Sequence, residues 1–203
     1  MLIGKRTLLL LTGCSMLFGC TAVPPRHLDN ICHIFDEKDG WYEDVKEASD
    51  RWGSPISIIM AFIHQESRFV AAAKPPRTRI LWIFPGPRKS SAYGFPQAKD
   101  STWDWYRKST GNGWSNRNNF DDATDFISWY NAQSSRGAGI NAQDAYNLYL
   151  AYHEGIGGYK RGTYKSKGWL MGVARKVGIR ANNYKTQLAG CEDRLSSGWW
   201  WPF

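Results

Sequence analysis

The feature that most constrains the fold is a helical spacing of apolar residues, which begins at Trp41 and recurs toward the C-terminus. Ile56, Ile59, Met60 and Ile63 occupy positions i, i+3, i+4 and i+7, so they lie on one face of an α-helix. A second stripe with this spacing consists of Ala145, Leu148, Tyr149 and Tyr152. Such stripes in a chain of 203 residues without an internal repeat predict a single, mainly helical all-α domain.

Helix-starting and helix-ending residues divide this region into several helices. Gly53 ends a helix over 41–52, and Ser54 followed by Pro55 is typical of an N-cap and a first helical residue. Asn141 is the expected N-cap of a later helix. The other predicted helices span 97–108, 121–135, 142–153 and 168–188.

An irregular insertion at 74–91 interrupts the helical pattern with four prolines and five basic residues. Its apolar centre, 80–84, is typical of a short strand or an apolar loop tip. An apolar run of this kind should cover something. Two interpretations stay open: a basic flap beside a substrate groove, or a loop packed on its own domain.

Residues 1–19 are typical of a bacterial signal peptide. Two basic residues precede an apolar run over 7–18, which is too short to span a bilayer. The run is followed by Gly-Cys20 in a sequence that resembles a lipobox, so Cys20 is expected to be acylated and to become the mature N-terminus. Cys14 is an alternative that leaves a shorter apolar region. Cys20 is incidental if the signal is an ordinary one or an uncleaved anchor.

The predicted export signal determines where the chain is expected to act. Residues 20–30 form a lipid-anchored tether, and 31–203 form the domain. Thr21 follows Cys20 where an inner-membrane lipoprotein often carries Asp, which in a Gram-negative cell predicts the periplasmic face of the outer membrane. The net charge of +8 suits an anionic membrane or an acidic polymer, and export excludes nucleic acid as the partner.

The two remaining cysteines, Cys32 and Cys191, stand near the two ends of the predicted domain. In an oxidising compartment they are candidates for a disulfide that closes nearly the whole domain, with two free thiols as the alternative. The chain contains no Cys-x-x-Cys pair and no His-x-x-x-His pair, so no metal site is expected.

Glu66 is the main anomaly, because it is a carboxylic acid on an apolar stripe. It follows Ile63 by three positions and Ile59 by seven, near the end of the predicted helix. Desolvation raises the pKa of a carboxyl group and favours the neutral acid, which a glycosidic general acid requires. The alternative is a Glu that reaches solvent at a frayed helix end or pairs with Arg68 or Lys74.

Three short motifs place this glutamate in a wider pattern. Residues 66–69 read Glu-Ser-Arg-Phe, which resembles the Glu-Ser-x-Phe motif of the soluble lytic transglycosylase family. Residues 92–97 resemble that family's Gly-Leu-Met-Gln motif, and 151–155 resemble its Ala-Tyr-Asn-Ala-Gly motif. Each motif alone is weak, but all three occur in the family's order over about half of the mature chain.

The resemblance implies a lysozyme-like fold, as in goose-type lysozymes, and an enzyme that needs no cofactor. We expect the protein to be a monomer. Such enzymes cut the β-1,4 bond between N-acetylmuramic acid and N-acetylglucosamine in peptidoglycan without water, leaving 1,6-anhydromuramic ends. Glu66 would be the catalytic acid and then the base, Ser67 would support its carboxyl group, and Gln97 would bond the sugar. The substrate-binding residues that the resemblance implies are Ser67, Tyr93, Gly94, Gln97, Tyr152 and His153.

The sequence departs from the family at Phe95, Pro96, His153 and Glu154. Glu154 adds a carboxylate near the groove, and a solvated surface charge is its expected role. A goose-type hydrolytic lysozyme is one alternative function, since an inverting hydrolase needs a second carboxylate to hold a water. The candidates for that group are Asp100, Asp121, Asp122 and Glu154. The other alternative is a non-catalytic glycan-binding lipoprotein, against which the intact Glu66–Ser67 pair argues.

Overall fold

A computed structural model describes residues 23–80 and 84–197 of the chain. The predicted signal peptide at 1–19 and the predicted acylation site Cys20 lie outside these residues. So do the centre of the apolar run, 81–83, and the Trp-rich segment 198–203.

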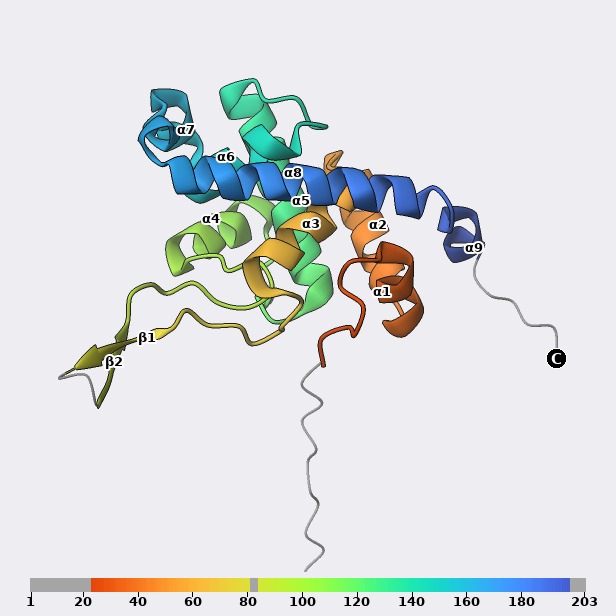
Figure 1. Ribbon diagram of the computed structural model, residues 1–203, viewed down its shortest axis with the longest axis horizontal. Helices are drawn as coiled ribbons and strands as arrows, with labels where there is room; N and C mark the ends of the chain where they lie inside the picture. Colours follow the sequence, from red (N-terminus) through yellow and green to blue (C-terminus); the bar gives the residue numbers. More distant parts are fainter. Residues whose placement is uncertain (1–22, 81–83, 198–203) are drawn as a thin grey trace, which may run out of the picture.

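Helices dominate the described part of the chain (Figure 1). In chain order they are α1 (Ile31–Glu37), α2 (Trp41–Trp52), α3 (Ile56–Ser67), α4 (Asp100–Thr110), α5 (Phe120–Ala138), α6 (Ala145–Glu154), α7 (Ile156–Arg161), the 3₁₀ turn η1 (Thr163–Ser166), α8 (Gly168–Leu188) and α9 (Glu192–Ser196). The predicted mainly helical architecture is therefore confirmed.

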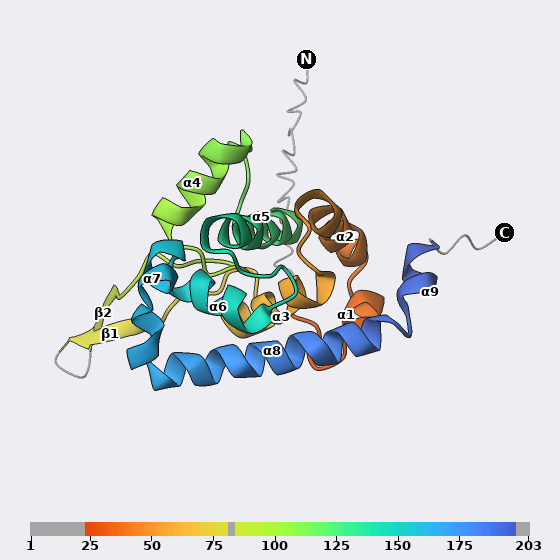
Figure 2. The same cartoon turned by 90° about the horizontal axis from the view of Figure 1, so that it is seen from above.

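The long helix α8 runs along one side of the molecule and contacts α3, α6 and α1 (Figures 1 and 2). On its other sides α3 contacts α5 and α2, so it lies inside the helical body. The predicted stripe on α3 is buried, and so are Ile58, Ala61 and Phe62 on its other faces. A helix covered on several sides requires apolar residues around its whole circumference.

Several helix boundaries differ from those predicted. Pro55, not Ser54, is the N-cap of α3, and the buried Ser54 hydroxyl accepts a hydrogen bond from Asn131 Nδ2 at 2.9 Å. Asp144 caps α6 by accepting from the Asn147 N–H at 3.0 Å, whereas Asn141 only closes the preceding turn. Helix α4 begins at Asp100 rather than 97, since residues 93–98 form a closed turn.

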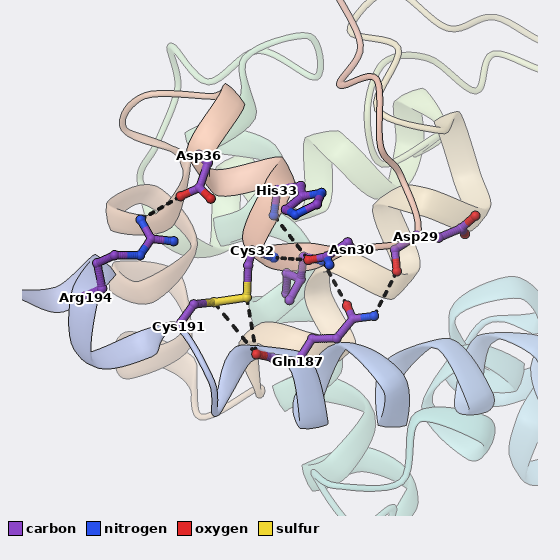
Figure 3. Close-up of a disulfide and its surroundings, with 9 residues drawn as sticks. Asp29, Asn30, Cys32, His33, Asp36, Gln187, Cys191 and Arg194 are labelled. Carbon is purple, nitrogen blue, oxygen red and sulfur yellow. Dashed lines mark hydrogen bonds and ion pairs between the residues drawn. A yellow bond between two sulfur atoms is a disulfide. The ribbon is translucent and has the colours of Figure 1, made fainter.

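The predicted disulfide between Cys32 and Cys191 is present in the structure (Figure 3). It joins α1 to the turn before α9, across 159 residues of chain. Gln187 reinforces this junction by accepting from the Ile31 N–H and donating to the Asp29 carbonyl oxygen, each at 3.0 Å. The beginning and the end of the described domain are thereby held together.

The insertion forms an antiparallel hairpin of β1 (Arg77–Ile80) and β2 (Phe84–Arg88), which projects from the helical body (Figures 1 and 2). Its register shifts between Arg77 and Arg79. Ile80 and Phe84, the two ends of the predicted apolar run, pair with each other, while 81–83 lie outside the described residues. The choice between a strand and a loop tip for this run therefore stays open, and the flap role stays a prediction. No helix within residues 23–80 and 84–197 has the length and apolar character needed to cross a membrane.

Candidate active site

Glu66 lies in the last turn of α3, directly before a sharp reversal of the chain. Arg68 and Phe69 both adopt left-handed backbone conformations, with φ of 52° and 62°. Consecutive non-glycine residues in this region are strained and persist only where the surroundings hold them. Phe69 is fully buried and stacks on Trp41 at 5.9 Å between ring centroids, which holds the reversal in place.

Glu66 faces a cavity of about 480 Å³ between α4, α5, the end of α6 and the turn after the hairpin. The cavity combines an apolar wall with polar groups, as carbohydrate sites do. The residues that line it are Glu66, Ser90, Ala92, Gln97, Ala98, Lys99, Ser101, Thr102, Phe126, Tyr130, Tyr152, His153, Glu154 and Gly155.

The carboxyl group of Glu66 is only partly open to this cavity and is otherwise surrounded by protein. Burial raises the pKa of Glu66 from 4.5 to about 7, although the hydrogen bond from Tyr149 lowers it. The Tyr149 hydroxyl donates to Glu66 Oε1 at 2.8 Å. Near neutral pH this carboxyl group can therefore both donate and accept a proton.

Two tyrosines of α6, Tyr149 and Tyr152, make hydrogen bonds that differ from those expected from the sequence. Tyr152 lines the cavity, but its hydroxyl donates to the Pro96 carbonyl oxygen at 2.6 Å. Tyr149, one turn earlier on the same stripe, is the residue that bonds Glu66. Its ring and that of Tyr152 both pack edge-on against Phe62. The apolar stripe that begins at Ala145 predicted that Tyr149 is buried. It could not predict that the Tyr149 hydroxyl bonds Glu66.

The structure brings three of the predicted substrate-binding residues to the cavity beside Glu66, namely Gln97, Tyr152 and His153. Ser67, Tyr93 and Gly94 are not among the residues that line it. The buried Ser67 hydroxyl donates to the Ile63 carbonyl oxygen at 3.1 Å rather than to the Glu66 carboxyl group. Two cations lie near the Tyr93 ring, with Lys74 at 5.3 Å and Arg117 at 5.4 Å from its centroid.

Gly94 shapes the turn that carries Gln97. Its φ is +77°, and a Cβ atom there would lie 2.0 Å from the Arg117 carbonyl oxygen. Gln97 is itself left-handed, with φ of 48°, and its Nε2 donates to the Ala73 and Gly94 carbonyl oxygens at 2.9 Å each. The close approach requires glycine at 94, and the Gln97 amide nitrogen braces the turn that forms one wall of the cavity.

Comparison with known families connects this geometry to an enzyme class. Residues 8–191 match the family model of the transglycosylase SLT domain, which covers most of the chain. The chain belongs to the transglycosylase SLT-domain family. Searches of curated proteins and of solved structures gave no match. Family membership confirms the predicted lysozyme-like, mainly helical fold and implies transglycosylase-type activity on peptidoglycan, and hence action in the cell envelope.

Within this SLT domain Glu154 is not the solvated surface charge that the sequence suggested. Its side chain is only 4% exposed, because Lys167 Nζ donates to both carboxylate oxygens at 2.8 and 2.9 Å. The Thr163 hydroxyl donates to the same group, and His153 Nδ1 lies 3.1 Å from Oε1. The hydrogen bond from Lys167 is the main cause that lowers the pKa of Glu154 to about 2.

Of the carboxylates considered as partners of Glu66, only Glu154 lines the cavity. Asp100 pairs with Arg117 at 2.8 Å, and Asp122 accepts from the Asn116 N–H at 2.8 Å. Across residues 23–80 and 84–197 of the SLT domain, no group of three or more His, Cys, Asp or Glu side chains has a metal-binding arrangement.

Proposed function

We propose that this SLT-domain protein is a lytic transglycosylase that cleaves the β-1,4 bond between N-acetylmuramic acid and N-acetylglucosamine. The observation that carries the proposal is a single carboxyl group, Glu66, whose pKa burial raises to about 7 inside a polar and aromatic cavity. A carboxylic acid that stays neutral near pH 7 is what cleavage of a glycosidic bond requires.

In the proposed reaction Glu66 first donates its proton to the glycosidic oxygen, and the bond to the muramic C1 breaks. The Glu66 carboxylate then takes the proton of the muramic C6 hydroxyl group, whose oxygen attacks C1. The products are a free N-acetylglucosamine end and a 1,6-anhydromuramic end. Glu66 returns to its protonated state, so no water and no cofactor are consumed. Tyr149 stabilises the carboxylate between the two steps through its 2.8 Å hydrogen bond.

The chemistry of Glu154 supports this route over hydrolysis. A hydrolytic lysozyme of the inverting type needs a second carboxylate that removes a proton from water. Glu154 is the carboxylate available in the cavity besides Glu66 among the described residues, and its pKa of about 2 makes it a weak base. Lys167 and Thr163 also occupy its oxygens.

The other parts of the proposal concern binding and location. Gln97, Tyr152 and His153 contact the glycan strand from the wall of the cavity, while Ser67, Tyr93 and Gly94 support the elements around it. The protein acts as a monomer from the periplasmic face of the outer membrane, where an acyl group on Cys20 anchors it. Unmodified protein in the soluble periplasmic fraction would contradict the anchor.

Mass spectrometry of digested sacculi tests the reaction. We expect anhydromuramic ends from the wild-type protein and none from Glu66→Gln, whose amide keeps the shape of the side chain but cannot transfer a proton. The rate should fall by about 10²–10⁴-fold. Reducing muramic ends would instead identify a hydrolase, and intact sacculi would identify a glycan-binding protein without activity.

A further inference from the structure

We propose that Trp169, together with His153, forms a sugar-stacking platform that extends the substrate cavity at the start of α8. The platform would bind a pyranose ring of the glycan strand next to the residues held at Glu66. This inference rests on the proposed function for its substrate, and it adds a binding subsite on a residue outside the three sequence motifs.

The position of Trp169 suggests this role. It is the second residue of α8, and its surface is 60% exposed. Its ring lies 5.2 Å from that of His153 at an interplanar angle of 79°. His153 lines the cavity, and Trp169 packs against it with more than half of its surface exposed, so we infer that Trp169 extends the cavity wall outward.

An ion pair between Glu154 and the partly exposed Lys167 links the two elements of this platform. Lys167, two residues before Trp169, donates to both oxygens of Glu154, and Glu154 also contacts Nδ1 of His153 at 3.1 Å. The Thr163 hydroxyl bonds the same carboxylate from η1. Glu154 therefore ties the end of α6, which carries His153, to the start of α8, which carries Trp169. A rigid platform loses less conformational entropy when a ligand binds.

The chemistry of a glycan strand matches this arrangement. The C–H faces of a pyranose ring pack on aromatic rings, while its hydroxyl and acetamido groups bond to polar neighbours. Trp169 offers the aromatic surface, and the imidazole of His153 offers a polar group beside it. Ser101 and Thr102 also line the cavity and offer further polar groups to a sugar.

Steady-state kinetics on soluble, uncrosslinked glycan strands tests the platform. We expect Trp169→Ala to raise KM about tenfold, which corresponds to about 1.4 kcal/mol of binding free energy. Because Trp169 does not touch Glu66, kcat should change less than about twofold. Trp169→Phe retains a smaller ring and should give an intermediate KM.

Trp114→Ala is the matched control, because Trp114 is 93% exposed and lies beyond the C-terminal end of α4, whereas the N-terminal end of α4 lines the cavity. It should leave KM and kcat unchanged. An unchanged KM in Trp169→Ala, or equal increases in both variants, would overturn the platform. Thermal unfolding of each variant checks that the fold is retained.

A binding measurement tests the platform independently of the proposed reaction. In the Glu66→Gln background, the dissociation constant for the same glycan strands should rise about tenfold when Trp169→Ala is added, and Trp114→Ala should have no effect. This result supports the platform even if the wild-type protein cleaves nothing, which would refute the proposed reaction alone. Equal affinities with and without Trp169, or no glycan binding by the Glu66→Gln protein, would refute the platform.

Discussion

Replacement of Glu66 by Gln should stabilise the fold at alkaline pH, even though it removes the proposed catalytic group. Burial raises the pKa of Glu66 from 4.5 to about 7 in the folded protein. The folded state therefore holds the proton more tightly than the unfolded chain does. Stability from this group is complete below pH 4.5 and is lost as pH rises through 7. At about 1.36 kcal/mol per pH unit, the loss amounts to about 3 kcal/mol by pH 8.

Urea unfolding of the wild type and of Glu66→Gln, each from pH 4 to pH 8.5, measures this effect. The Gln amide does not ionise, so the variant does not lose stability through this group as pH rises. The free energy of unfolding of the variant, relative to the wild type, should rise by about 3 kcal/mol across the range, mostly between pH 4.5 and 7. The m-value should stay the same in both proteins if the folded and unfolded states keep their compactness.

Glu154→Gln is a comparison variant, because the contribution of Glu154 to stability depends on pH in the opposite direction. Its pKa is lowered, mainly by the hydrogen bond from Lys167, so its stabilisation is present above pH 4.5 and is lost as pH falls toward 2. Glu154→Gln should therefore be less stable than the wild type at pH 7. The reasoning about burial at Glu66 is refuted if Glu66→Gln and the wild type lose stability in parallel as pH rises.

Three further outcomes follow from the geometry. Tyr149→Phe removes a hydrogen bond that lowers the pKa of Glu66, so the fall in kcat/KM at alkaline pH should move upward by about one pH unit; an unmoved or lowered midpoint contradicts this. Gly94→Ala should lower the free energy of unfolding by more than about 2 kcal/mol in urea titrations, because its Cβ would lie 2.0 Å from a carbonyl oxygen, whereas a neutral effect means the turn relaxes. Replacing Cys32 and Cys191 by Ser should cost about 4–5 kcal/mol in the same titrations through the lost constraint on the unfolded chain, and the reduced wild type should match the double variant.

Local features of the fold could be predicted from the sequence because neighbours along the chain determine them. The helices over 41–52 and 168–188 occur with the predicted bounds. A period of 3.6 residues repeats within a few turns, and αL glycines such as Gly53 end a helix through their own backbone freedom. The same periodicity placed Glu66 on a buried stripe, so the main chemical candidate was visible without a structure.

The helix N-caps and the fold of the insertion at 74–91 were harder to predict from the sequence, because residues far away in the chain can bond the same polar groups. Ser54 is a residue type that is common at N-caps. Its hydroxyl group instead accepts a hydrogen bond from Asn131, which is 77 residues away in the chain. Asn141 and Asp144 are both good caps, and only the packing of α6 decides that Asp144 begins the helix. The insertion carries prolines that suggest a loop, yet β1 and β2 pair with each other as a hairpin.

The partners of the site residues were decided only by the tertiary structure. Tyr149 reaches Glu66 across 83 residues of chain, while Tyr152, one turn away, bonds Pro96 instead. From the sequence, Glu154 resembles a surface charge. In the folded protein Thr163 of η1 and Lys167, directly before α8, donate hydrogen bonds to its carboxylate. Periodicity specifies which side of a helix faces inward, but a hydrogen bond between distant segments depends on atomic positions that arise only when the helices pack together.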